Sequence, residues 1–368
     1  MNYYLRFLIT LFFTLISFES FAQKCGLNFK TDGIVEFYRV VDILKSDKSP
    51  SEDDWNRFNN SPGYDVLTKL EFGKNYLRDI ITVAFKPSEQ KSESEVKNRY
   101  KKQGNYYRLF IDETVNGLKS ADSCRESVMK FVKMITDSKT LDKVKEETGK
   151  YIDDAVIDSS FAVNFIVFSD SRGYDPIIIG ITDPDKSTEE EHILLVAHEL
   201  FHNLRNKRVK LELPERGEPD SRIMNTINSI HNEGIADMIN VHKLYADNPE
   251  LINKIESQRV IKEQKYQKSV ISAFDIILSE LSVNKESADE LEGMASSLIT
   301  RSGHPAGYFM AKTINEVYGE KELKRLALKP FEFFYVYNNA AKKSGSVPGF
   351  SNETLSYLKR LEAKYFRE

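Results

Sequence analysis

In the first half of the chain, apolar residues recur at steps of three and four positions. From Asp32 to about Tyr151, this spacing places them along one side of successive helices. The clearest run consists of Ile34, Phe37, Val40, Val41 and Leu44. Polar stretches and Pro- or Gly-containing breaks separate such runs, as expected for turns. The pattern predicts a helical region over residues 23–155, which contains no histidine and which we interpret as scaffold.

A β-strand pattern follows this helical region. Residues 161–168 are mostly β-branched or aromatic, and residues 177–182 form a second run of this kind. The stretch between the two runs contains Gly and Pro and predicts a turn or loop. Helical spacing then returns and continues to the last residues of the sequence. The pattern as a whole predicts a mostly α fold with a small β-sheet, which is an α+β architecture.

A capped and largely apolar helix is predicted to begin near Ser187. Ser187 stands three positions before Glu190, and Thr188 stands three positions before Glu191, which is the spacing of a capping box. The five residues 193–197 are all apolar, which indicates a helix that is buried on most sides. Polar side chains further along such a helix would be costly to bury without partners.

Two histidines and a glutamate follow directly, as His-Glu-Leu-Phe-His at residues 198–202. On a helix, His198 and His202 lie one turn apart on the same face, so both imidazoles can reach one metal ion. Glu199 lies about 100° around the helix, where it can contact a water on that ion without ligating it. A zinc catalyst needs a third protein ligand and one open position, and Glu233 is the best candidate for the ligand. Asp237, four positions later, shares the face of Glu233 and could accept the ring N–H of a ligating histidine.

Together, the His-Glu-x-x-His motif and the Asn-Glu-x-x-x-Asp motif at 232–237 resemble the gluzincin metallopeptidases, the thermolysin-like group. The resemblance implies that Zn²⁺ is held by His198, His202 and Glu233. It further implies that Glu199 is the general base and that Asp237 orients the first histidine. The chain also resembles uncharacterised secreted bacterial zinc-peptidase-like proteins.

The resemblance to gluzincins covers about residues 160–320. It implies a zincin-like catalytic region over residues 156–368, flanked by helices at its C-terminal side. It also implies that an edge strand near the site can pair with an extended peptide through main-chain hydrogen bonds, a part that we assign to residues 177–182. The alternative is that these residues belong to an ordinary core hairpin.

Two further side chains are candidates for stabilising the oxyanion that forms when a peptide carbonyl becomes tetrahedral. Many gluzincins place a tyrosine or histidine downstream of the zinc site for this purpose. His304 and Tyr308 are four positions apart after a Gly- and Pro-marked turn, so both could face a cleft. The alternative is that His304 caps the turn and Tyr308 packs in the core. We interpret the three remaining histidines as surface or structural residues; they are His192, His231 and His242.

The N-terminal residues have the pattern of a secretory signal peptide. Arg6 precedes an apolar run at residues 7–17 that is too short to span a bilayer, and small residues before Gln23 suit cleavage after Ala22. We therefore expect a signal peptide at residues 1–22 and export to the periplasm or the extracellular space, with no stable membrane span in the mature chain. The alternative is an uncleaved anchor.

Charge and cysteine content narrow the remaining possibilities. The formal net charge of −4 provides no basic footprint, so we expect no nucleic-acid partner. The two cysteines, Cys25 and Cys124, either form one disulfide or stay as free thiols.

The sequence thus predicts a secreted zinc metallopeptidase that hydrolyses peptide or protein substrates with a zinc-bound water and Glu199 as general base. One alternative is an aminopeptidase of the same group, although the Gly-x-Met-Glu-Asn motif of such enzymes is missing from the sequence. Another alternative is a catalytically silent zinc-binding protein, against which the intact Glu199 argues.

Overall fold

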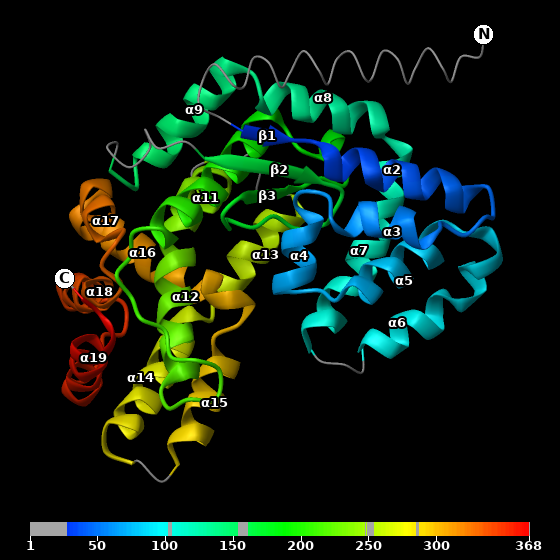
Figure 1. The fold of residues 1–368 in the computed structure, drawn as a ribbon. Coiled ribbons are helices and arrows are strands. Elements are labelled where there is room, and N and C mark those ends of the chain that lie inside the picture. Colours follow the sequence, from blue (N-terminus) through cyan, green and yellow to red (C-terminus); the bar gives the residue numbers. More distant parts are fainter. Residues whose placement is uncertain are drawn as a thin grey trace. The chain divides into compact units, whose positions relative to one another are not determined.

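The computed structural model describes residues 28–101, 105–153, 161–246, 248, 254–284 and 287–367. Within these residues the chain is 73% helical, with 17 α-helices and one parallel sheet of three strands (Figure 1). The predicted fold class, mostly α with a small β-sheet, is confirmed. The predicted signal peptide at residues 1–22, its cleavage point and Cys25 lie outside the described residues.

The chain divides into two compact units. The first comprises Met1–Lys143 and Ser159–Glu199, and the second comprises Val144–Asp158 and Leu200–Glu368. Helix α11 (Glu189–Asn206) is continuous through this division. The predicted division into a helical N-terminal region at 23–155 and a zincin-like catalytic region at 156–368 stays a prediction.

The first unit is built from short amphipathic helices around a small sheet. Its helices, including α9, which continues into the second unit, are α2 (Asp32–Lys45), α3 (Glu52–Asn59), α4 (Tyr64–Leu70), α5 (Lys74–Phe85), α6 (Glu93–Lys101), α7 (Asn105–Ser123), α8 (Arg125–Ile135) and α9 (Ser138–Gly149). The apolar run predicted for α2 is completely buried. Helix α3 begins with a reciprocal capping box between Ser51 and Asp54, which satisfies two backbone N–H groups. The helical pattern that the sequence predicts from Asp32 to about Tyr151 is therefore present over its described residues.

The sheet has the order β1 (Asn28–Lys30), β2 (Ala162–Ile166) and β3 (Ile177–Gly180), and both pairings are parallel. The two predicted strands are present as β2 and β3. Because they run parallel, the hairpin interpretation of residues 177–182 is wrong. The connection between them folds back over β3 instead of making a tight turn.

This connection also occupies main-chain groups of β3 that an added peptide strand would need. The N–H and C=O of Ile178 both bond to Arg172 at 2.8 Å, and the N–H of Gly180 donates to Ser171 Oγ at 3.1 Å. A side chain at Gly180 would lie 2.1 Å from the carbonyl oxygen of Asp170, so only glycine fits under the loop. The hypothesis that a peptide pairs with β3 is therefore wrong at these positions.

Among its described residues, the second unit has helices as its regular elements, joined by loops, and one isolated antiparallel bridge between Leu211 and Phe366. After α11 it contains α12 (Ser221–Asp237), the π-helix η4 (Met238–Ala246), α13 (Ile255–Gln264), α14 (Gln267–Val283), α15 (Ala288–Leu298), α16 (His304–Tyr318), α17 (Glu320–Leu326), α18 (Pro330–Ser344) and α19 (Asn352–Tyr365). Short 3₁₀ helices occur at Pro87–Ser92 and Pro184–Lys186 in the first unit and at Arg301–Gly303 in the second.

Helices α12 and α16 approach each other at two glycines. A Cβ added to Gly234 would lie 2.5 Å from the carbonyl oxygen of Gly307, and one added to Gly307 would lie 2.2 Å from the carbonyl oxygen of Ile230. The two backbones are therefore in direct contact, with no side chain between them. This contact brings the residue before Gly234, which is Glu233, close to the start of α16.

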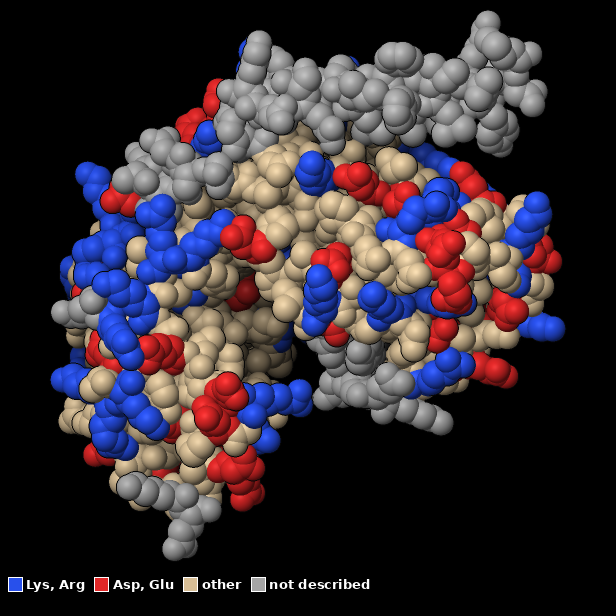
Figure 2. Space-filling model, viewed as in Figure 1, with Lys and Arg blue, Asp and Glu red and all other residues tan. Residues whose placement is uncertain are grey.

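The visible surface carries charges of both signs. Figure 2 shows Lys and Arg side chains next to Asp and Glu over the face that it displays. Charged side chains of the described residues form many ion pairs, such as Arg325 with Glu322 at 2.7 Å and Lys364 with Asp220 at 2.8 Å. Among the described residues, no helix combines the length and the apolar character needed to cross a membrane.

Candidate metal centre

Helix α11 begins and is buried as its sequence predicts. Of the two possible capping boxes, Thr188 and Glu191 form one: the N–H of Glu191 donates to Thr188 Oγ1, and the N–H of Thr188 donates to the Glu191 carboxylate. The apolar turn that follows is almost completely buried. As a result, His198, Glu199 and His202 are also buried, with exposed fractions of 5%, 7% and 7%.

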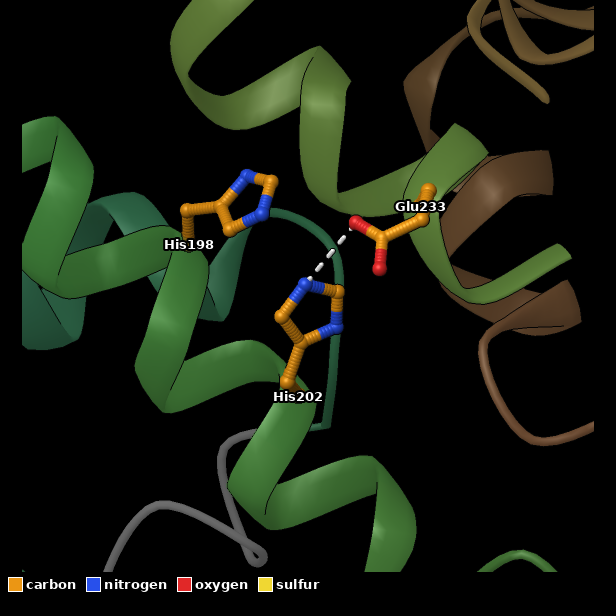
Figure 3. A group of neighbouring side chains, drawn as sticks. All are labelled: His198, His202 and Glu233. Atoms are coloured by element: carbon orange, nitrogen blue, oxygen red, sulfur yellow. Dashed lines mark ion pairs between the residues drawn. The ribbon is translucent and has the colours of Figure 1, made fainter. Parts of the chain in front are cut away.

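The structure brings the three predicted ligands together. One possible ligand atom from each of His198, His202 and Glu233 lies within 4.8 Å of the other two. His202 Nε2 and Glu233 Oε2 are 3.1 Å apart. Figure 3 shows both imidazoles extending from neighbouring turns of α11 toward the carboxylate on α12. Two nitrogens and one oxygen thus face a common point from two helices.

A second group of side chains adjoins this cluster. His304, the first residue of α16, has its Nε2 3.4 Å from Glu233 Oε2. Its Nδ1 lies 3.0 Å from each oxygen of the Asp237 carboxylate, and Asp237 is buried. Asp237 was predicted to accept the ring N–H of a zinc-ligating histidine. In the structure its carboxylate contacts the ring nitrogen of His304 instead. Its predicted role toward a zinc-ligating histidine stays a prediction.

Tyr308 lies one turn further along α16. It is 3% exposed, and its hydroxyl lies 3.1 Å from His242 Nδ1. Its burial agrees with the alternative that Tyr308 packs in the core. Its hydroxyl forms a hydrogen bond with His242. The oxyanion-stabilising roles of His304 and Tyr308 stay predictions.

The fold and the site agree with a comparison of the sequence with known families. Residues 55–346 match a family described as "Putative zinc dependent peptidase (DUF5700)". The chain belongs to this family. The matched residues include both α11 and α12, and therefore all three clustered side chains of this DUF5700 member. No curated protein matches the sequence. No solved structure matches it either.

The donor set of this DUF5700 protein fits zinc. Nitrogen and oxygen ligands of zinc lie about 2.0–2.2 Å from the ion, which puts neighbouring ligands of a tetrahedral site roughly 3.3–3.6 Å apart. The separation of 3.1 Å between His202 and Glu233 is close to this value. Two imidazoles and one carboxylate are the ligand set of a catalytic zinc site, in which a fourth position stays open.

Two of the histidines that we interpreted as structural have the expected packing. His231 is completely buried, and its Nε2 donates to the carbonyl oxygen of Leu326 at 2.9 Å. Burial lowers its pKa well below the ordinary value, so the ring is neutral. His192 packs edge-on against Phe131, with ring centroids 4.6 Å apart.

Sequence reasoning did not anticipate the contacts of two residues of this DUF5700 protein, His242 and Arg205. We interpreted His242, which lies past the end of α12, as a surface or structural residue and assigned it no specific contact. In a π-helix the hydrogen bonds run from residue i to residue i+5, so each turn holds about one more residue than in an α-helix. This brings His242, five positions after Asp237, back toward α16 and Tyr308. The second missed residue is Arg205, three positions after His202, which is completely buried although it carries a charge.

Proposed function

We propose that this protein is an exported zinc metallopeptidase of the gluzincin type that hydrolyses peptide bonds in peptide or protein substrates. The observation that supports this most directly is the convergence of His198, His202 and Glu233 in a chain whose family is described as zinc dependent and peptidase. Export is proposed from the N-terminal sequence alone.

In this proposal each side chain has a separate task. His198, His202 and Glu233 hold the ion, which, when bound, polarises water and the substrate carbonyl. Glu199, next to the first ligand on α11, accepts a proton from the attacking water and passes it to the leaving amine. Its position on a buried helix limits access of bulk water to the proton that is transferred.

His304 is the better placed of the two oxyanion candidates. The Asp237 carboxylate accepts a hydrogen bond from Nδ1, which fixes the ring and leaves Nε2 on the side of Glu233. With protons on both ring nitrogens, Nε2 can donate to an oxyanion that forms beside the metal ligands. Tyr308, which is buried against His242, would support α16 or donate a second hydrogen bond.

The test combines metal analysis with proteolysis. We expect the purified mature chain to contain about one zinc ion and to cleave unfolded casein, and we expect a chelator to abolish cleavage until zinc is restored. E199Q should keep its zinc and lose nearly all hydrolysis, because the amide cannot accept the proton. Unchanged hydrolysis by E199Q would reject the assigned base. Zinc without cleavage of any protein pool would favour the silent zinc-binding alternative.

A further inference from the structure

The most unusual side chain in the second unit is a completely buried arginine on the helix that carries the histidines. Arg205 is 0% exposed and lies three positions after His202 on α11. A buried charge is costly unless its hydrogen-bonding groups are satisfied and an opposite charge is near. The groups that surround the Arg205 side chain therefore indicate its role.

The Arg205 guanidinium bonds mainly to α12. Its Nε donates to His231 Nδ1 at 3.2 Å, and Nη2 lies 2.9 Å from the same atom. Nη2 also donates to Asn228 Oδ1 at 2.8 Å, and Nη1 donates to Asn206 Oδ1 at 3.0 Å. These three acceptors are neutral groups. Burial lowers the pKa of Arg205 to about 9, and the negative charge of Glu233 opposes this lowering.

The tautomer of His231 completes this arrangement. Because His231 Nε2 donates to the carbonyl oxygen of Leu326, its Nδ1 has a lone pair to accept from Arg205. One chain of hydrogen bonds thus runs from α11 through α12 to the end of α17. The planar fork of arginine can bond several acceptors at once, which an ammonium group cannot do in the same geometry.

The contacts of α11 with α12 reach two different sides of α12. His202 meets Glu233, and Arg205 meets His231, which is two positions earlier and so points about 200° away around the helix. Contacts on two sides fix the rotation of a helix about its own axis. A small rotation of α12 would carry the Glu233 carboxylate away from both imidazoles.

We infer that Arg205 is a positioning residue of the metal centre: through His231 and Asn228 it sets the rotation of α12 so that Glu233 meets His198 and His202. This inference rests on the proposed zinc site. It assigns no contact with substrate to Arg205.

The experiment measures zinc affinity, by competition with a chelating dye, in the mature chain stripped of metal. R205M keeps much of the side-chain volume and removes the fork and the charge. We expect a loss of zinc affinity of about 10- to 100-fold, as is typical when a group that orients metal ligands is removed. R205K keeps the charge without the fork, and its affinity should lie between those of R205M and the wild type.

The matched control is N338A. Asn338 is also a buried polar residue of the second unit, and its Oδ1 accepts the N–H of Phe350 at 2.8 Å on a helix that carries none of the clustered side chains. N338A should lower the thermal stability and leave zinc affinity within a few-fold of the wild type. If N338A loses as much affinity as R205M, the effect is general destabilisation and the inference is overturned.

The remaining outcomes are also decisive. A folded R205M that binds zinc like the wild type overturns the inference. If R205M does not fold, the double variant N228A/H231L replaces it, because it removes both acceptors that α12 offers to Arg205. A folded double variant with wild-type zinc affinity overturns the inference equally. Failure of the wild type itself to bind zinc would reject the proposed function, and this result is separate from any difference between variants.

Discussion

The contact between Gly234 and Gly307 makes a quantitative prediction about the site. In G234A, the new Cβ would lie 2.5 Å from the carbonyl oxygen of Gly307 and 2.6 Å from its carbonyl carbon. Ordinary contact begins at 3.4 Å, so the α12 and α16 backbones must separate by roughly 0.9 Å. The obstacle is backbone, which cannot rotate away as a side chain can.

Two opposing effects decide the stability of G234A. Alanine in a helix interior is favoured over glycine by about 0.8–1.0 kcal/mol. Overpacking a rigid contact typically costs about 1–3 kcal/mol and sometimes more. Because the whole helix pair must move, we expect the upper part of that range and a net destabilisation of about 2 kcal/mol. The separation also displaces Glu233, and a misplacement of about 1 Å at a catalytic site can lower the reaction rate about 100-fold.

The matched control is G293A in helix α15. The nearest atom to a Cβ at Gly293 is Nη1 of Arg222, at 3.1 Å, and this end of a long side chain can move. G293A should therefore be neutral or stabilised by up to about 1 kcal/mol, with unchanged zinc affinity. Thermal and urea unfolding of both variants, with zinc titration, measures the difference. Equal stability of G234A and G293A, with wild-type zinc affinity in both, would refute the proposed backbone contact.

Two further predictions concern single side chains. D237A removes the acceptor for His304 Nδ1, so we expect the rate of casein cleavage to fall about 10- to 100-fold. Zinc affinity should change less than the rate; a larger loss of zinc than of rate would show that Asp237 mainly serves a metal ligand. Burial lowers the pKa of His192 below 6.5, so the unfolded chain binds a proton at this residue at a higher pH than the folded chain does. The contribution of His192 to the free energy of unfolding is therefore complete above about pH 6.5 and is lost as the pH falls below that value. H192F keeps the packing against Phe131 and should lose less stability than the wild type between about pH 7 and pH 5 in urea unfolding; identical losses would contradict this assignment.

The elements that sequence predicted well depend on local patterns. The capping box of Thr188 and Glu191 and the apolar turn after it identify α11 because both act within one helix. The spacing of His198 and His202 places them on one face for the same reason. Glu233 required the resemblance to a known motif, because nothing local shows that a residue 31 positions later meets His202.

The features that sequence missed depend on contacts between distant segments. Strand β1 has only three residues, and its parallel pairing with β2 joins residues more than 130 positions apart, so no periodicity indicates it. The loop that covers β3 requires glycine at 180 because of a carbonyl group ten positions earlier. No local pattern distinguishes the π-helix after α12 from an α-helix, and its extra residue per turn is what brings His242 to Tyr308.

The position of Glu233 is determined at three points along α12. At the start, the buried Glu292 accepts hydrogen bonds from the N–H groups of Asp220, Arg222 and Ile223, at 3.1–3.3 Å. In the middle, Arg205 holds the side of α12 that bears His231. Near the end, the glycine contact sets its distance from α16. A useful metal site requires its ligands to be held within about 0.5 Å of their working positions. A single contact could not fix the translation, the rotation and the distance from α16 of a 17-residue helix at once. The Glu292 contact limits translation along the helix axis, the Arg205 contact limits rotation about it, and the glycine contact sets the distance from α16.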